Sequence, residues 1–138
     1  MKQIIIITHK TMAKGLTETV QFFAGKVKNL HYICAYMNSK NEFQINELTS
    51  LIKTFKPNDQ IFLLTDLLGG SVNQHCSQLI KDHHINVITG INLGLVLSIV
   101  LSPVDTLNDE EINKLVNQAR TQMIYMNDYN DSNNDDDE

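Results

Sequence analysis

Long hydrophobic segments and cysteine motifs are both missing from this sequence. Its two cysteines, Cys34 and Cys76, lie 42 positions apart and form no CxxC pair, which argues against a disulfide framework or a zinc knuckle. No apolar run approaches the roughly 20 residues that cross a bilayer. The N-terminal run, residues 4–7, is too short for the core of a signal peptide. We therefore expect a cytoplasmic protein that is not inserted into a membrane.

The common phosphate- and nucleotide-binding motifs are absent too. There is no GxxxxGK[ST] motif, which excludes a P-loop, and no GxGxxG motif, which argues against a dinucleotide-binding fold. A receiver-type phospho-aspartate site needs acidic residues after the first strand, where this chain has Thr8 and His9. The Ser/Thr-rich turn of a flavodoxin-like site is poorly matched.

Excess charge is confined to the C-terminal end. The net charge is −5, and residues 127–138 carry six of the sixteen acidic residues and no basic one. The remaining 126 residues hold eleven basic and ten acidic side chains, so nothing attracts the folded part to nucleic acid or to an anionic membrane. We expect one domain over residues 1–126 and an acidic disordered tail over 127–138.

Strand and helix signals alternate along the chain. Short apolar segments typical of buried strands cover residues 2–8, 30–36, 60–65 and 85–89. Between them, apolar residues recur at helical steps of three and four: Leu16, Val20, Phe23 and Val27; Ile45, Leu48, Ile52 and Phe55; Val72, Cys76, Leu79 and Ile80. Two further helices are expected at about 93–101 and 107–118, and residues 121–126 fit either a last helical turn or a short strand.

This alternation predicts an α/β fold. Four β–α units with short connections form a doubly wound, open parallel sheet with helices on both faces. Ligands of such sheets bind beyond the carboxyl ends of the strands, where the strand order reverses. The residues that follow each apolar segment are therefore the candidates for a site.

Two of these strand ends carry reactive side chains. His9 follows the first strand and Asp66 the third, so they are neighbours if the strand order is 2-1-3-4. A carboxylate that accepts a hydrogen bond from one imidazole nitrogen leaves the other nitrogen as a nucleophile. The turn Gly69-Gly70-Ser71 adds backbone N–H groups and a hydroxyl that can hold a phosphoryl group. The combination predicts phosphoryl transfer through phosphohistidine.

Ordinary explanations remain open for each residue taken alone. A single histidine at a strand end is more often hydrogen-bonded or exposed than nucleophilic. An aspartate before glycines is commonly a turn or cap residue, and Gly-Gly-Ser opens many helices. Only the shared position of His9, Asp66 and the glycine turn at neighbouring strand ends favours a functional site.

Three motifs, in order and at strand ends, resemble those of one family. The first is Thr8-His9-Lys10, followed by Ala13-Lys14-Gly15-Leu16; the second is Asp66-Leu67-Leu68-Gly69-Gly70-Ser71-Val72; the third is Gly90-Ile91-Asn92-Leu93-Gly94-Leu95. Over roughly residues 2–126, the chain resembles the enzyme IIA component of the mannose-family sugar phosphotransferase system of bacteria.

The resemblance implies a phosphocarrier. His9 would accept a phosphoryl group on Nε2 from the protein HPr and pass it to a histidine of the cognate IIB component, and so indirectly to the membrane components IIC and IID. Asp66 would hold Nδ1–H. Further positions that match the family's site are Thr65, Gly69, Gly70 and Ser71, with Thr8, Lys10 and Asn92 at its possible edge.

The resemblance also implies an assembly. Family members are homodimers with strand order 2-1-3-4 and a fifth, antiparallel strand exchanged between subunits, for which residues 121–126 are the candidate. No metal or nucleotide cofactor is implied, because the phosphoryl group arrives already activated on nitrogen. The adjacent histidines His83 and His84 have no ligand cluster that would suggest a metal site.

This chain departs from the family pattern at three positions. Lys10 replaces a usual glycine, and Val72 and Gly94 replace two usual prolines. A lysine at position 10 is strained if its backbone needs φ > 0. Asn92 either contacts the loop after the third strand or caps the next helix. Two alternatives to the sugar phosphocarrier remain: a regulatory module whose phosphohistidine is sensed by a partner, and a dihydroxyacetone-type phosphocarrier.

Overall fold

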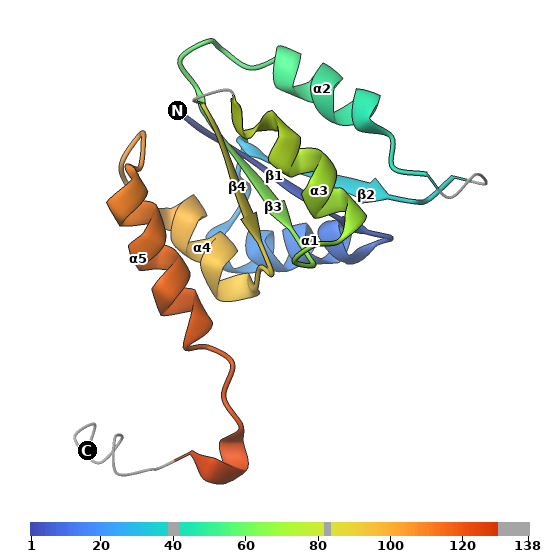
Figure 1. Ribbon diagram of the computed structural model, residues 1–138. Helices are drawn as coiled ribbons and strands as arrows, with labels where there is room; N and C mark the ends of the chain where they lie inside the picture. Colours follow the sequence, from blue (N-terminus) through green and yellow to red (C-terminus); the bar gives the residue numbers. More distant parts are fainter. Residues whose placement is uncertain (39–41, 82–83, 130–138) are drawn as a thin grey trace.

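Four parallel strands form the centre of the molecule in the computed structural model, which describes residues 1–38, 42–81 and 84–129. The strands are β1 (Lys2–His9), β2 (Leu30–Ala35), β3 (Gln60–Thr65) and β4 (Ile85–Thr89), and their order in the sheet is β2-β1-β3-β4 (Figure 1). The predicted 2-1-3-4 parallel sheet is confirmed.

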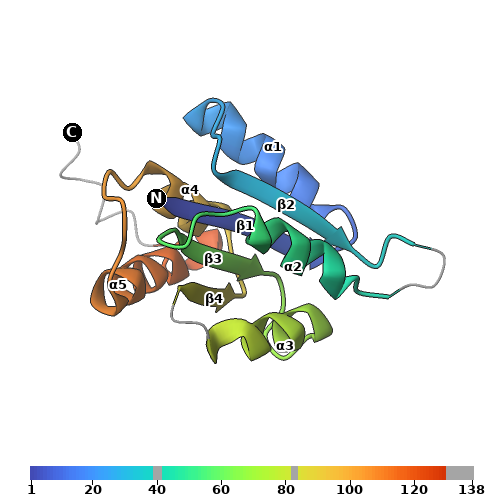
Figure 2. The same cartoon turned by 90° about the horizontal axis from the view of Figure 1, so that it is seen from above.

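Helices cover both faces of this sheet (Figures 1 and 2). One face is packed by α1, α4 and α5, and the other by α2 and α3. The helical elements are α1 (Met12–Ala24), α2 (Ile45–Lys53), α3 (Ser71–Ser77), α4 (Leu93–Leu101) and α5 (Asp109–Arg120), with short 3-10 turns η1 (Gln78–Lys81) and η2 (Met126–Asp128). The arrangement is the expected doubly wound α/β fold.

The isoleucine run of β1 supplies both cores. Ile4 and Ile6 point into the core under α1 and α4, whereas Ile5 and Ile7 point into the core under α2 and α3. All four are fully buried. Because successive side chains of a strand alternate between faces, a central strand with helices on both sides must be apolar at every position.

Two predicted helical stripes end earlier than their spacing suggested. Phe23 was expected inside but is 61% exposed, although it lies within α1. The helix ends at Ala24, before Gly25 with φ +78°, so Val27 packs on the core from the loop. Ile80 is 52% exposed. The chain tightens after Ser77 into a 3-10 turn of three residues per turn, which rotates Ile80 off the buried stripe.

Residues 121–126 form no strand in this single chain. Thr121 and Gln122 turn at the end of α5, and the chain then leaves the body of the domain toward η2 (Figure 1). The exchanged strand therefore stays a prediction. The domain boundary expected at residue 126 falls on the first residue of η2, and residues 130–138 of the expected tail lie outside the described residues.

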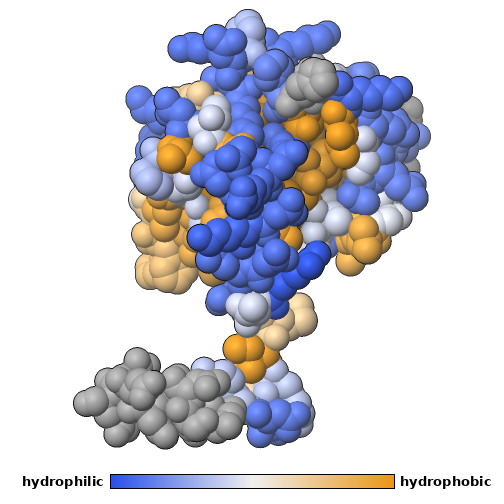
Figure 3. Space-filling view, turned by 60° about the vertical axis from the view of Figure 1, so that its left-hand side comes forward, coloured by the Kyte–Doolittle hydropathy of each residue, from blue (hydrophilic) through white to orange (hydrophobic). Residues whose placement is uncertain are grey.

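The outer face of α5 is polar. In Figure 3 it forms the blue band down the middle of the molecule, with hydrophobic surface on both sides of it. A capping box at Asn108 and Glu111 begins the helix, since each side chain binds the backbone N–H of the other residue. Across the described residues, no helix has both the length and the apolar character needed to cross a bilayer.

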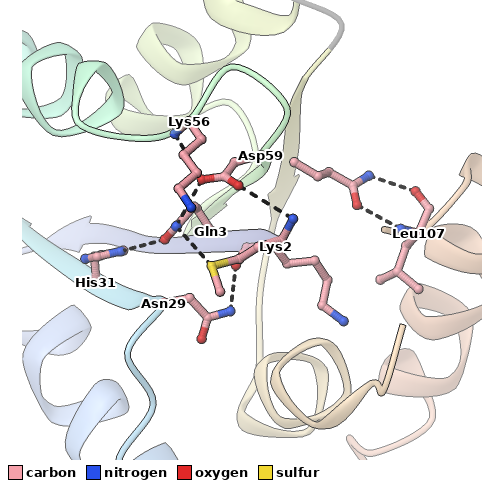
Figure 4. Close-up of polar contacts among 9 residues, drawn as sticks. Lys2, Gln3, Asn29, His31, Lys56, Asp59 and Leu107 are labelled. Carbon is pink, nitrogen blue, oxygen red and sulfur yellow. Dashed lines mark hydrogen bonds and ion pairs between the residues drawn. The ribbon is translucent and has the colours of Figure 1, made fainter. Parts of the chain in front are cut away.

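Polar side chains close the amino ends of the strands, opposite the predicted site (Figure 4). The carboxylate of Asp59 accepts hydrogen bonds from Gln3 Nε2 at 3.2 Å and from Lys56 N–H at 3.1 Å. Gln60 binds both backbone groups of Leu107. The buried ammonium of Lys2 donates to the carbonyls of Ser102 at 2.9 Å and Val104 at 2.6 Å. These contacts fix β1 and β3 to the connections around them.

Two phenylalanines provide a direct test of this core. Phe62 of β3 is fully buried, whereas Phe22 of α1 is 82% exposed. We expect Phe62→Ala to lower the free energy of unfolding by about 3–5 kcal/mol, because it leaves a cavity, and Phe22→Ala to change it by less than about 0.5 kcal/mol. Urea unfolding followed by circular dichroism measures both. Equal losses in the two variants would contradict the described packing.

Candidate active site

The candidate site lies at the carboxyl ends of β1 and β3. Thr65 of β3 pairs with Ile7, and β1 continues two residues beyond that pair to His9, whose backbone N–H reaches the carboxylate of Asp66 just past the end of β3. On the other side, His9 pairs with Ala35 at the end of β2. β1 connects forward to a helix on one face and β3 to a helix on the other, so this edge is the switch point of the sheet.

One carboxylate oxygen of Asp66 binds His9 twice. Oδ2 accepts the backbone N–H of His9 at 2.9 Å and lies 2.9 Å from ring atom Nδ1. The other oxygen, Oδ1, accepts the N–H of Leu67 at 3.0 Å. Because an ionised carboxylate only accepts, Nδ1 is the protonated nitrogen and Nε2 is left with its lone pair. The His9 side chain is 36% exposed and that of Asp66 only 10%.

The contacts to His9 also keep Asp66 ionised. Burial, the largest single influence, acts to raise the pKa of Asp66. The hydrogen bonds from the backbone and ring of His9, together with the charge of a protonated His9, outweigh burial, so the pKa lies below the usual aspartate value. The carboxylate is therefore available to accept Nδ1–H at neutral pH.

Two glycines shape the turn between Asp66 and α3. Gly69 has φ +76°, a conformation that glycine adopts without strain. A Cβ on Gly70 would lie 3.3 Å from both Cβ and the carbonyl oxygen of Leu67, and 3.7 Å from Cε1 of His9. A side chain at position 70 would therefore crowd Leu67 within the turn and contact the imidazole. The Gly70 N–H itself donates to the Leu67 carbonyl at 3.1 Å.

The remaining predicted residues take supporting positions. Thr8 is fully buried, and its Oγ1 accepts the N–H of Ala13 at 2.7 Å near the start of α1. Thr65 is also fully buried, and its hydroxyl has no hydrogen-bond partner within the described structure. Asn92 takes the second of its two alternatives. It caps α4 by accepting Leu95 N–H at 2.9 Å and donates to the Ala119 carbonyl at 2.8 Å.

Lys10 has the positive φ that would strain a lysine at this position. Its φ is +55°, and its ammonium donates to the carbonyl of Tyr36 at 2.6 Å. Tyr36 has φ +63°. These two are the non-glycine residues with positive φ among the described parts of the chain, and both flank His9. Strained backbone of this kind concentrates at functional sites.

Tyr36 is the site residue that the sequence analysis missed. Its ring stacks on the imidazole of His9, with centroids 5.1 Å apart and planes 11° apart, and its hydroxyl forms a hydrogen bond with the hydroxyl of Ser71. The apolar pattern predicts one strand over residues 30–36, whereas β2 ends one residue earlier, at Ala35. A strand end placed one residue earlier would have put Tyr36 among the candidates, beside Lys10.

His75 and His31 have partners other than His9 and Asp66. His75 is exposed on α3 and stacks on Phe43, with ring centroids 5.2 Å apart. His31 binds Gln3 at the opposite end of the sheet. Of the pair His83 and His84, the first lies outside the described residues. Within those residues, no three histidine, cysteine or acidic side chains come together to hold a metal ion.

A protein-family comparison is consistent with this geometry. The model of the EIIA-man family, described as "PTS system fructose IIA component", matches residues 3–118. The chain belongs to this family. PTS denotes the phosphotransferase system, and the match covers every strand and helix that positions His9 and Asp66.

Individual relatives are distant but consistent. The mannose-specific EIIAB component of Escherichia coli K12 is 24% identical over 110 residues, which are 79% of this chain and 34% of that protein. The chain thus spans about a third of the length of the curated relatives it matches.

Two solved structures share the fold. One is a Klebsiella pneumoniae protein assigned provisionally as a phosphoenolpyruvate-dependent sugar phosphotransferase permease, with TM-score 0.82, 24% identity and coverage of 92% of both chains. The other is phosphotransferase system component EIIA of Streptococcus agalactiae, with TM-score 0.73, 24% identity and coverage of 92% of this chain and 98% of that one.

Replacing Asp66 should flatten the acid limb of the stability curve. Because the pKa of Asp66 is lower in the folded chain, its charge stabilises the fold above the usual aspartate pKa of about 3.9 and ceases to do so as pH falls through the lower folded value. We expect the urea midpoint of Asp66→Asn to fall less than that of the wild type between about pH 5 and about pH 3.

Asp128→Asn is the matched control, since Asp128 is an exposed aspartate beyond α5. Its urea midpoint should follow the wild-type pH dependence. An Asp66→Asn variant with the same slope as this control would show that the carboxylate is not held by His9.

Proposed function

We propose that this protein is a phosphocarrier of the bacterial sugar phosphotransferase system. His9 accepts a phosphoryl group from phospho-HPr and passes it to a histidine of the cognate IIB component, for sugar uptake with phosphorylation through the membrane components IIC and IID. The observation that carries the proposal is the contact of Asp66 Oδ2 with both the backbone and Nδ1 of His9 at 2.9 Å. Membership of the EIIA-man family supports it.

In the proposed reaction, His9 acts as the nucleophile through Nε2. With the Nδ1 proton held by Asp66, the Nε2 lone pair attacks the phosphorus of the donor in line, the new N–P bond forms, and the donor's N–P bond breaks. The electron pair of that bond returns to the donor nitrogen. The phosphorylated imidazole keeps its Nδ1 proton and gains positive character, which the adjacent carboxylate stabilises.

The turn that begins α3 provides donors for the transferred group. The first helical hydrogen bond is from Gln74 N–H to the Gly70 carbonyl. The N–H groups of the preceding residues, Ser71, Val72 and Asn73, therefore have no acceptor within the helix. Together with the Ser71 hydroxyl, they are the donors we assign to the phosphoryl oxygens.

Exposed apolar side chains next to these residues in the chain support partner docking. Four large apolar side chains lie within three residues of His9, Tyr36 or Asp66 in the chain and are 48–84% exposed: Met12, Met37, Leu67 and Leu68. HPr and the IIB component must use overlapping surfaces, because each has to bring its histidine to the same Nε2. An exposed apolar surface of modest size suits such transient contacts.

Substitution of His9 tests the proposed reaction. We expect the wild-type chain, incubated with phosphoenolpyruvate, enzyme I and HPr, to gain one acid-labile phosphoryl group by intact mass, and His9→Gln to gain none, because the nucleophile is lost. His75→Gln is the matched control, since His75 is an exposed histidine on α3. It should be labelled like the wild type.

Failure of the wild type to be labelled, or labelling of His9→Gln, would overturn the proposal. Labelled wild-type protein that no IIB component can dephosphorylate would instead support the regulatory alternative, in which the phosphohistidine is read by a partner and not relayed.

We also propose a homodimer in which residues 121–126 add a fifth, antiparallel strand to the edge of β4 in a second copy. β4 lies at the edge of the sheet. The segment beyond α5 exposes four large apolar side chains, from 46% to 89%, in the single chain: Met123, Ile124, Tyr125 and Met126. An unpaired strand edge and an exposed apolar segment in the same chain are complementary.

A pair of aspartate substitutions tests the dimer. Tyr125 is 67% exposed in the exchanged segment, and Phe22 is 82% exposed on α1. We expect Tyr125→Asp to weaken the dimer by about tenfold or more, because a charge would be buried at the new interface. Phe22→Asp should leave it unchanged. Sedimentation equilibrium of the full chain measures both, and a monomeric wild type would contradict the proposal.

A further inference from the structure

Tyr36 connects the two parts of the proposed site. Its half-buried ring lies over the imidazole of His9 at 5.1 Å and 11°, and its hydroxyl is hydrogen-bonded to the Ser71 hydroxyl in the first turn of α3. It contacts the nucleophile on one side and a donor of the phosphoryl-binding turn on the other. It is not part of any of the three motifs that carry the family resemblance.

Lys10 holds Tyr36 in this position. The Lys10 backbone N–H donates to the Ala35 carbonyl at 2.8 Å, and its ammonium donates to the Tyr36 carbonyl at 2.6 Å. Lys10 and Tyr36 both have left-handed backbone, which bulky side chains rarely adopt. Neither left-handed conformation is favourable for the residue by itself, so each depends on the bonds between the two. Lys10 and Tyr36 therefore form one structural unit.

We propose that Tyr36, held by Lys10, is a positioning residue for phosphoryl transfer: its ring fixes the plane of the His9 imidazole, and its hydroxyl orients the Ser71 hydroxyl toward the transferred group. This inference rests on the proposed phosphocarrier function. Lys10, which stands where the family usually has glycine, then acts through Tyr36.

The imidazole needs a second constraint beyond Asp66. One hydrogen bond to Nδ1 fixes that nitrogen but leaves the ring plane free to tilt, because the torsion about Cβ–Cγ of histidine is broad. Stacking against a parallel phenol ring removes this freedom. Nε2 is then presented in one direction before the donor arrives, which reduces the entropy cost of reaching in-line geometry.

The hydroxyl pair directs the Ser71 proton. A serine hydroxyl has one proton to donate and two lone pairs with which to accept. If Tyr36 donates to Ser71, the serine proton is free to bind a phosphoryl oxygen, and the hydrogen bond it receives strengthens it as a donor. Gly70, beside Ser71, faces Cε1 of His9, the ring atom next to Nε2.

Two substitutions at Tyr36 separate the ring from the hydroxyl. Tyr36→Phe keeps the stack, so the His9 ring-proton shifts should stay near those of the wild type, while transfer from phospho-HPr slows by about fivefold. Tyr36→Leu removes the stack, so the His9 ring protons should move downfield and transfer should slow by more than about tenfold. Rapid-quench kinetics and NMR of histidine-labelled protein measure the two effects.

Tyr32 provides the matched controls. It is the other tyrosine of the β2 segment and is 44% exposed. Tyr32→Phe and Tyr32→Leu should leave both the His9 ring shifts and the transfer rate within about twofold of the wild type. A Tyr36→Leu variant that folds and also stays within these limits would overturn the proposal, because Tyr36 would then only fill space.

A double-variant cycle tests the role of Lys10. If Lys10 acts by holding Tyr36, Lys10→Gly should slow transfer in the wild-type background and add no further slowing in the Tyr36→Leu background. Independent, additive losses would show that the lysine acts on the phosphoryl group directly and would overturn this part of the inference.

The NMR measurement separates this inference from the proposed function. If the wild-type chain takes up no phosphoryl group, the proposed function fails, and the role of Tyr36 in transfer fails with it. The His9 ring shifts of the unphosphorylated variants still show whether the Tyr36 ring lies over the imidazole.

Discussion

The site depends on a single oxygen atom, Oδ2 of Asp66, that binds His9 through both its backbone and its ring. The backbone bond closes the gap between the end of β1 and the loop after β3, so the ring is held relative to the sheet. The ring bond selects the tautomer in which Nε2 carries the lone pair. If either contact were lost, the other would no longer hold the His9 ring in a defined position. The carboxylate after β3 is therefore needed for both the structure of this edge and the state of the imidazole.

The central position of β1 makes that contact possible. β1 pairs with β2 on one side and β3 on the other, and its eight residues carry it past the end of β3. His9 can therefore meet Asp66 from one neighbour and Tyr36 from the other. The glycine turn follows Asp66 directly, so the donors of α3 begin within five residues of the carboxylate. Membership of the EIIA-man family relates this arrangement to phosphotransferase components.

The sequence alone predicted the strands, their parallel pairing and the meeting of His9 with Asp66, because apolar runs and chain connectivity determine these features. It did not predict Tyr36, whose role depends on a left-handed turn one residue beyond β2 and on a side-chain stack, neither of which has a local signature. Asn92 could be read as a cap or as a site residue, and only the structure shows that it accepts the N–H of Leu95 as a cap and binds the Ala119 carbonyl of α5. Val27 was placed on a helix that ends earlier, before Gly25, and Ile80 was misplaced because the chain tightens into a 3-10 turn.

The four isoleucines of β1 have a consequence for folding. A run that is equally apolar at positions 4, 5, 6 and 7 fits either face of the sheet, so a slip by one residue would cost the cores little, unlike a slip in an alternating strand. The polar residues at the two ends of β1 therefore distinguish the correct register from a shifted one. The ammonium of Lys2 must reach two carbonyls, and the hydroxyl of Thr8 must accept the N–H of Ala13. The correct register of the central strand is thus specified by its polar ends.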